Sequence, residues 1–485
     1  MATKIYGVGA FIAVDQGAGI NYIPSNSFDF GFSASDTSIK LVDLSQKAPI
    51  TYSDTIANLQ DKNGVAIGTV TQITNYISSF SGLSPSGQSL VKIDSPLTAF
   101  GEILTAQLSP VFQLTFEYTV DNTELGTIEK LGTGTVTQSD AMCVVSTGVT
   151  TGSTAEWESS KNATYKAGMG GVVRFTALFT TGVAGTQQTV GLADVEGSSA
   201  SHKNGYSVGY NGDAFSFLRW QNDVLFPIPQ SSWDDPMDGT GASGMTLDPT
   251  KLNVYFIQFQ YLGAGAVKLW IENDATGKMV LAHNLLYSNL NTVPSIYNPN
   301  FHLMIHALNG VTTSDLIVKS ASMAYFIEGE TKYTEIQQPQ QSTGKRQKTS
   351  VTTQVALFTI RNKSTYVTKD NFMDIILENI SASIEASSAN NLGEITLTKN
   401  ATLGGTPAWV DINTTDSIVD IDVSGTTVTG GKTIMTINMA GKNDRDIVNL
   451  TDFDLILVPG DTLTVSGTSA NSATFNASML WKELF

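Results

Sequence analysis

The chain has 485 residues and a net charge of −17, from 27 Lys and Arg against 44 Asp and Glu. Nucleic acid and anionic membrane surfaces both attract clustered cations, so this charge argues against either partner. The length predicts two to four domains. Charged residues make up only 15% of the chain and glycine occurs 43 times, a composition that favours strands and turns over long surface helices.

The only cysteine, Cys143, excludes an intrachain disulfide and a metal site made of cysteines. Its apolar neighbours Met142, Val144 and Val145 predict a buried strand position, where a thiol behaves as a small hydrophobic group. We expect no signal peptide and no membrane insertion, because no apolar stretch approaches the length of a transmembrane helix.

Residues 1–90 are predicted to form a small α+β region. Residues 27–32 and 37–44 have the composition of two strands joined by a turn. Further on, Val70, Ile73 and Ile77 recur at helical spacing and predict one short helix. Two interpretations remain open for this region: it docks the protein onto a larger assembly, or it caps the next domain.

Residues 91–336 are predicted to form the first large domain. Tyr255, Ile257 and Phe259 alternate with polar or aromatic residues, and the chain then turns through two glycines into residues 267–271, which alternate in the same way. A glycine-bearing link between two alternating runs predicts a β-hairpin. Asn211-Gly212-Asp213 predicts a second hairpin. Short strands with regular turns are typical of a β-sandwich.

Residues 337–350 are polar and rich in glutamine, which predicts a linker. Residues 351–485 contain eight strand-like runs, a number that fits a jelly roll. Within them, Pro459-Gly460-Asp461 predicts a type II turn between two strands. The predicted fold class is therefore mainly β, with two β-sandwich (jelly-roll-like) domains and a small α+β N-terminal region.

Several phrases resemble structural proteins of tailed-bacteriophage virions. In the first domain they are the glycine-rich turn of residues 237–251 and Ser-Pro-Leu-Thr-Ala-Phe-Gly at residues 95–101. In the last domain they are residues 355–366, residues 457–467 and the closing Trp-x-Glu, Trp481 to Glu483. The resemblance implies a lectin-like or concanavalin-like first sandwich. It also implies a fibre or appendage of the tail, neck or head that docks by its N-terminal region.

The resemblance sets the functional prediction: a non-enzymatic structural protein located in the virion. Its expected partners are other copies of the chain, as a trimer by family analogy, other virion proteins, and a host-surface glycan. The alternatives are a host-glycan-binding receptor protein and a capsid decoration or cement protein. A glycan-cleaving enzyme would need two carboxylates facing each other across a groove. No nucleotide-binding or nucleophile-elbow motif is present, so we predict no enzyme, no catalytic residue and no cofactor.

Aromatic and acidic residues in the first domain are the candidates for glycan binding: Tyr210, Trp233, Asp234 and Asp235. Trp233 stands in a Ser-Ser-Trp-Asp-Asp-Pro loop and is predicted to be the exposed contact. The alternative is that these aromatic rings serve packing or a subunit interface, as large aromatic side chains usually do.

Two groups of residues suggest metal ligands. Asp234, Asp235 and Asp238 have the oxygen ligands that calcium takes, but aspartate is also a common turn residue, and we favour that role. His302 and His306 lie on one predicted strand and point to the same face. No third ligand is identifiable for this pair, so no metal site is predicted.

Overall fold

The computed structural model describes five strands within residues 4–43, two within residues 59–68, and then residues 107–195, 202–329, 338–386, 391–453 and 455–485. The chain divides into two compact units, Met1–Thr105 and Ala106–Phe485. Over these described ranges no α-helix occurs, and no helix is long and apolar enough to cross a membrane. The helix predicted near Val70 and Ile77 lies outside the described residues.

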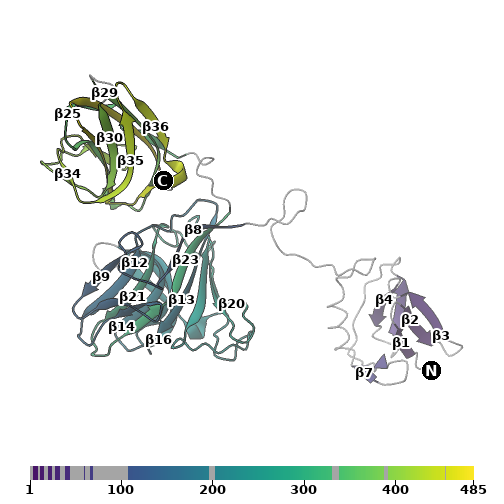
Figure 1. Ribbon diagram of the computed structural model, residues 1–485. Helices are drawn as coiled ribbons and strands as arrows, with labels where there is room; N and C mark the ends of the chain where they lie inside the picture. Colours follow the sequence, from purple (N-terminus) through teal and green to yellow (C-terminus); the bar gives the residue numbers. More distant parts are fainter. Residues whose placement is uncertain are drawn as a thin grey trace. The chain divides into compact units, whose positions relative to one another are not determined.

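The first unit contains seven described strands (Figure 1). Three of them form an antiparallel sheet: β1 (Lys4–Val8), β2 (Phe11–Asp15) and β3 (Ile20–Pro24). The others form two antiparallel pairs, β4 (Phe28–Phe32) with β5 (Ile39–Asp43) and β6 (Leu59–Gln60) with β7 (Ala66–Gly68). The predicted strands at residues 27–32 and 37–44 are β4 and β5, so this prediction is confirmed.

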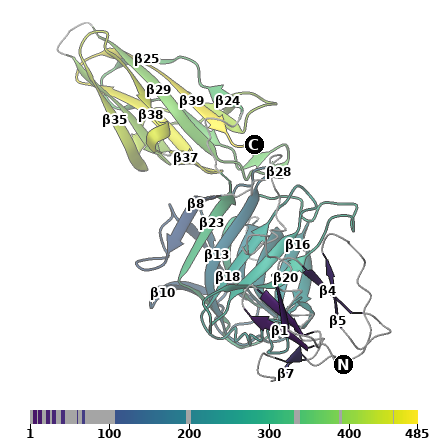
Figure 2. The same cartoon turned by 90° about the vertical axis from the view of Figure 1, so that its right-hand side faces the viewer.

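The second unit begins with a sandwich of two antiparallel sheets. Its nine-stranded sheet runs β10-β11-β22-β13-β18-β19-β20, with β23 paired to both β13 and β8; Figure 2 shows β8, β23, β13 and β18 side by side. The bounds of its strands are β8 Leu108–Thr115, β10 Thr135–Ser139, β11 Met142–Ser146, β13 Gly170–Phe179, β18 Asn253–Phe259, β19 Val267–Glu272, β20 Met279–Leu285, β22 Ile317–Ser320 and β23 Ser322–Glu328.

A seven-stranded sheet packs against it, in the order β17-β16-β15-β14-β21-β12-β9. The 3-10 turn η3 (Gln230–Ser232) follows β17. The strands are β9 Gly126–Leu131, β12 Ser153–Ser159, β14 Thr186–Val195, β15 His202–Asn211, β16 Ala214–Gln221, β17 Val224–Pro229 and β21 His302–Asn309.

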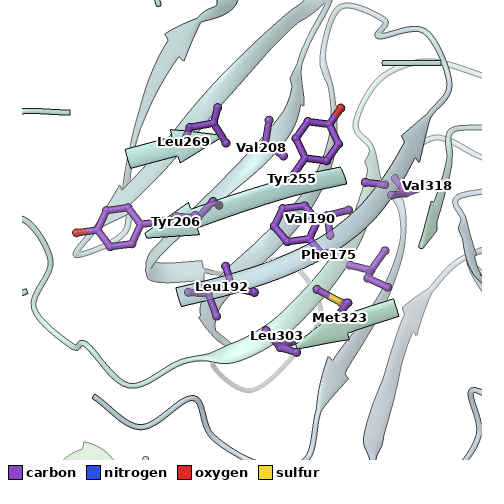
Figure 3. Close-up of a cluster of buried hydrophobic side chains, with 14 of the residues drawn as sticks. Phe175, Val190, Leu192, Tyr206, Val208, Tyr255, Leu269, Leu303, Val318 and Met323 are labelled. Carbon is purple, nitrogen blue, oxygen red and sulfur yellow. The ribbon is translucent and has the colours of Figure 1, made fainter. Parts of the chain in front are cut away.

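Apolar side chains from both sheets fill the space between them. Figure 3 shows Phe175 and Tyr255 of the nine-stranded sheet together with Val190, Tyr206 and Leu303 of the seven-stranded sheet. All five are buried. Burying a large apolar side chain stabilises a fold by about 1.5–3 kcal/mol, so this inter-sheet layer supplies most of the driving force for the sandwich.

Both predicted hairpins of this domain are present. β18 and β19 pair antiparallel with Ile257 opposite Leu269, and both side chains are buried. β15 and β16 pair around Asn211 and Gly212. Gly212 has a φ of +67°, a conformation that glycine adopts at little cost. The glycines and the two-residue alternation therefore located these elements correctly.

The burial expected for Cys143 is also confirmed. It lies on β11 with none of its surface exposed. Burial raises the pKa of its thiol, which keeps the thiol protonated and unreactive.

The second sandwich consists of two six-stranded sheets with a separate apolar core. One sheet runs β24-β39-β29-β36, with β25 paired to β39 and β37 paired to β29; the other runs β32-β33-β26-β38-β30-β35. The strands of the first sheet are β24 Gln340–Ser342, β25 Arg346–Val351, β29 Ile375–Ala386, β36 Arg445–Asn449, β37 Ile456–Leu457 and β39 Ala473–Glu483. Those of the second are β26 Val355–Asn362, β30 Leu392–Lys399, β32 Val410–Asp411, β33 Val419–Asp422, β35 Lys432–Ala440 and β38 Thr462–Ser469.

Short elements complete this sandwich. Two strand pairs lie outside the main sheets, β27 (Thr365–Tyr366) with β28 (Lys369–Asp370) and β31 (Thr402–Leu403) with β34 (Val428–Thr429). Thr451–Phe453 forms the 3-10 turn η4. At the turn between β37 and β38, Gly460 has a φ of +92° and the amide of Asp461 donates to the carbonyl of Val458 over 3.0 Å. This geometry is the predicted type II turn.

The described part of the predicted linker belongs to the second sandwich. Within residues 338–350, β24 and β25 pair with β39, with Gln341 opposite Trp481 and Lys348 opposite Phe475. Between them Thr343 is buried, and its amide donates to the carbonyl of Met479 over 3.0 Å. The polar composition of these residues predicted a linker. Strand pairing is made by backbone groups and does not depend on side-chain polarity, and edge strands often carry polar residues. Composition alone therefore could not reveal these two strands. The mainly β fold with two sandwiches is confirmed.

Candidate functional site

Acidic residues lie on the face of the seven-stranded sheet that points away from the inter-sheet core. On β12, Ala155 and Trp157 belong to that core, so Glu156 and Glu158 project from the opposite face. The neighbouring strand β21 places His306 directly opposite Glu156. The two-residue period of β12 thus brings two carboxylates to one face, beside an imidazole.

Glu156, His202 and His306 form a cluster in which all three residues are buried. The distance from Glu156 Oε2 to His202 Nε2 is 2.8 Å, and from the same oxygen to His306 Nε2 it is 4.0 Å. The two imidazole rings are 4.8 Å apart and nearly perpendicular. β12 and β21 are adjacent in the sheet, whereas His202 comes from β15, which is separated from β21 by β14. We call these three residues the Glu156 cluster.

The electrostatics of the Glu156 cluster favour a charged pair. Burial alone raises the pKa of the Glu156 carboxyl, but His202 and His306 outweigh it and hold that pKa below its usual value. Burial alone lowers the pKa of His202, but the facing Glu156 carboxylate raises it above its usual value. An opposite charge at hydrogen-bond distance has this effect on both partners. Both shifts favour the charged forms, a carboxylate on Glu156 and an imidazolium on His202.

Glu158 and His302 lie beside this cluster, at a cavity of about 660 Å³ that both line. Thr127 donates its hydroxyl to Glu158 Oε1 over 2.8 Å, whereas Glu158 Oε2 has no hydrogen-bond partner among the described residues. Burial raises the pKa of Glu158 above its usual value. The carbonyl of Ser159 lies 2.6 Å from Nδ1 of His302. We call this space the Glu158 cavity.

The other wall of the Glu158 cavity comes from the second sandwich and includes Asp370, Asn371 and Phe372. The rings of Phe372 and His302 are 6.2 Å apart. Nearby, Asn162 donates its amide to Asp374 over 3.1 Å. Burial raises the pKa of Asp374 to about 6. The cavity therefore combines carboxyl, amide, hydroxyl and imidazole groups with an aromatic ring.

The aromatic residues predicted to bind glycan are packed inside the first sandwich. Trp233 is only 4% exposed, and its indole N–H donates to the carbonyl of Ile228 over 3.0 Å. Tyr210 is buried and packs edge-on against Phe215, with ring centroids 5.1 Å apart. The alternative interpretation, in which these rings serve packing, describes their positions. The expectation that Trp233 is exposed is wrong, because the loop folds its ring inward.

The aspartates next to Trp233 accept hydrogen bonds from the backbone. Asp235 is buried and accepts from the amides of Met237 and Ser243. Asp238 accepts from the amide of Thr240 over 2.9 Å. This is the turn role that the sequence favoured over calcium binding. Of the four predicted glycan-binding residues, only Asp234 has a largely exposed side chain. Its Oδ2 atom lies 3.3 Å from Nδ1 of His283. None of the four residues lines the Glu158 cavity.

The sequence indicated only part of this site. The spacing of His302 and His306 was visible, but the structure places His306 in the Glu156 cluster and His302 at the Glu158 cavity. Glu156 and Glu158 carried a usable signal, since two acidic residues flank a tryptophan at strand spacing. The sequence gives no signal that His202 lies beside this cluster, because that position depends on where β15 and β21 stand in the sheet.

Comparisons with known proteins give similarities in structure alone. No family model matches the chain, and no curated protein matches it. A glycosyl hydrolase family protein from Mycobacterium fortuitum is 12% identical, with a TM-score of 0.31, over 45% of this chain and 99% of that chain. Lectin I-B4 from Griffonia simplicifolia is 11% identical, with a TM-score of 0.30, over 45% and 99%. A legume lectin-like domain from Entamoeba histolytica is 12% identical, with a TM-score of 0.29, over 45% and 98%.

One prediction is corrected by these comparisons. The absence of catalytic motifs led to the prediction that the chain is not an enzyme. The similar structures include glycosyl hydrolases, so a β-sandwich of this kind does not exclude catalysis. At this identity the likeness concerns the fold, and it assigns neither an activity nor a ligand to this chain.

Proposed function

We propose that this protein binds a carbohydrate in the Glu158 cavity. The observation that carries the proposal is the cavity itself: about 660 Å³ of space lined by both Glu158 and Phe372. Ligand sites of this size combine apolar surface with a few convergent polar groups. Sugars present hydroxyl groups that both donate and accept hydrogen bonds, as well as C–H faces that pack on aromatic rings.

The polar lining suits such a ligand. With its raised pKa, Glu158 stays protonated to a higher pH than an ordinary glutamate. Its Oε2 atom has no partner among the described residues, so a sugar hydroxyl can satisfy it. A buried polar atom left without a partner costs about 1–3 kcal/mol. Binding a hydroxyl there removes that cost.

The biological setting of the proposal is the surface of a host cell. The resemblance of the sequence to virion proteins of tailed phages supports an oligomeric appendage that presents the sandwiches to a host glycan. Capsid decoration and tail attachment both remain compatible with this role.

The test is a screen of the full-length chain against a library of oligosaccharides and bacterial surface polysaccharides, followed by titration of each ligand found. We expect Phe372→Ala and Glu158→Ala each to weaken binding by about tenfold or more, equivalent to about 1.4 kcal/mol. Each ligand is also incubated with the protein and examined for shorter products, which reports cleavage separately from binding.

Two matched variants control for general damage. Phe226 lies on β17 and Glu272 on β19, and neither lines the Glu158 cavity. Phe226→Ala and Glu272→Ala should therefore leave the dissociation constant unchanged. The proposal fails if no glycan in the library binds, or if all four variants bind as tightly as the native chain.

A further inference from the structure

We propose that the Glu156 cluster is a binding site for one divalent transition-metal ion, with zinc as the best fit. Two imidazoles and one carboxylate form a common ligand set for zinc. This site is distinct from the proposed glycan site, because none of Glu156, His202 and His306 lines the Glu158 cavity. The inference therefore does not depend on the proposed function.

The distances in the cluster are close to those of a metal site. The candidate ligand atoms of the three residues all lie within 4.8 Å of one another. In a tetrahedral zinc site with bonds of about 2.0–2.2 Å, two ligand atoms are about 3.3 Å apart. On metal binding, the 2.8 Å and 4.0 Å separations from Glu156 Oε2 would each change by less than about 1 Å, and the separation between the two histidine nitrogens, at most 4.8 Å, by up to about 1.5 Å. Side-chain rotation can supply such shifts without moving the strands.

A second observation also points to a cation at this site. Glu156 is fully buried, and its Oε1 atom has no hydrogen-bond partner among the described residues. A carboxylate oxygen in this position costs free energy unless a cation or a donor reaches it. A metal ion bound between Glu156 and the two histidines would lie within reach of this oxygen. The fourth coordination position would fall to water, as in zinc sites with three protein ligands.

The surroundings support binding of a cation. The ring of Trp220 lies 5.2 Å from that of His202, and Trp220 packs with Ala193, Leu218 and Met304 in a small apolar cluster. An apolar shell excludes water and strengthens the attraction between a cation and a carboxylate. The alternative is that no metal binds and that Glu156 and His202 form an ion pair with each other.

Metal content of the full-length chain decides between the two. The protein is stripped with EDTA in denaturant, refolded with or without zinc sulfate, passed through a desalting column and analysed by elemental mass spectrometry. Refolding is included because the three residues are buried and metal entry requires opening of the site. We expect about one zinc ion per chain after refolding with zinc, and a higher Tm than that of the metal-free protein.

Variants locate the bound ion. His202→Asn and His306→Asn each remove one imidazole and should reduce the zinc content to near zero. His283→Asn is the matched control, because His283 belongs to the same sandwich but lies beside Asp234; it should retain one zinc ion. Far-ultraviolet circular dichroism of every variant verifies folding, and the native chain provides a direct test even if a variant does not fold.

Two results would overturn the proposal. The first is a native chain that refolds with zinc present but retains none, which would leave the metal-free ion pair as the role of the cluster. The second is a folded His202→Asn variant that keeps as much zinc as the native chain, which would place the ion at another site.

Discussion

At the scale of single residues, the first sandwich is unusual for the charged groups buried in one of its sheets. The Oε2 atom of Glu156 lies 2.8 Å from Nε2 of His202, and both side chains are buried. Breaking a buried pair by removing one partner costs roughly 3–5 kcal/mol, because the other charge is left without compensation. The pair is therefore a sensitive point for stability as well as the centre of the proposed metal site.

The pH dependence of stability follows from the raised pKa of His202. Its folded pKa lies above the unfolded value of 6.5, so its stabilising effect is complete below pH 6.5 and is lost as the pH rises through the folded pKa. The charges facing it are Glu156, Asp194 and Glu158. In EDTA, the difference in free energy of unfolding between the native chain and His202→Asn should shrink from pH 6 to pH 9. Urea denaturation at each pH measures it, and a difference that grows with pH contradicts the assignment.

At the scale of elements, the strand β39 organises the second sandwich. It pairs with β29 along its length and also with β24 and β25. Near its end, the carboxylate of Glu483 is buried and accepts three hydrogen bonds: from the hydroxyl of Ser417 at 2.6 Å, the amide of Ile418 at 2.9 Å and the indole of Trp481 at 3.0 Å. These contacts give a physical role to the closing Trp-x-Glu phrase.

Replacing Glu483 with alanine should destabilise the second sandwich strongly. The change leaves three buried donors without an acceptor, each at a cost of about 1–3 kcal/mol, so we expect a loss of roughly 3 kcal/mol or more. Calorimetry of the full-length chain measures it. Glu394→Ala is the matched control, since Glu394 is exposed on β30 and should change stability by less than about 0.5 kcal/mol. Equal effects of the two variants would contradict this role.

At the scale of the whole molecule, the two sandwiches have separate apolar cores. One is centred on residues such as Phe175 and Tyr255, the other on residues such as Phe358 and Trp481.

A domain with its own core can fold alone. We therefore expect a fragment of residues 338–485 to give the dispersed amide spectrum of a folded β protein in nuclear magnetic resonance. The matched fragment 351–485 lacks β24 and nearly all of β25 and should be less stable to urea. A collapsed spectrum for fragment 338–485 would show that this core needs the rest of the chain.

The proposed phage appendage makes a prediction about assembly. Family resemblance implies a trimer, so light scattering of the full-length chain should give three times the chain mass of 51.7 kDa. Dilution should leave this mass unchanged, since virion subunits must remain associated. A mass of one chain at all concentrations would contradict a self-assembling fibre and would favour a subunit that assembles only on another protein.

The sequence by itself determined the fold class and most of the local geometry. Alternation in β18 and β19 gave the hairpin, and Asn211-Gly212 and Pro459-Gly460 gave two turns, because these features depend on residues adjacent in the chain. Polarity was a poorer guide: residues 338–350 have the composition of a linker, yet they pair with β39 through backbone groups that composition does not reveal.

Only the tertiary structure decided where the candidate sites lie. Trp233 was predicted to be exposed, but packing against the first core buries it. His202 meets Glu156 although 46 positions separate them, because the order β15-β14-β21-β12 brings their strands together. Local sequence sets the face on which a side chain stands, since that face follows from a two-residue period. Which distant side chains share that face depends on strand order, and strand order is fixed by the burial of the whole core.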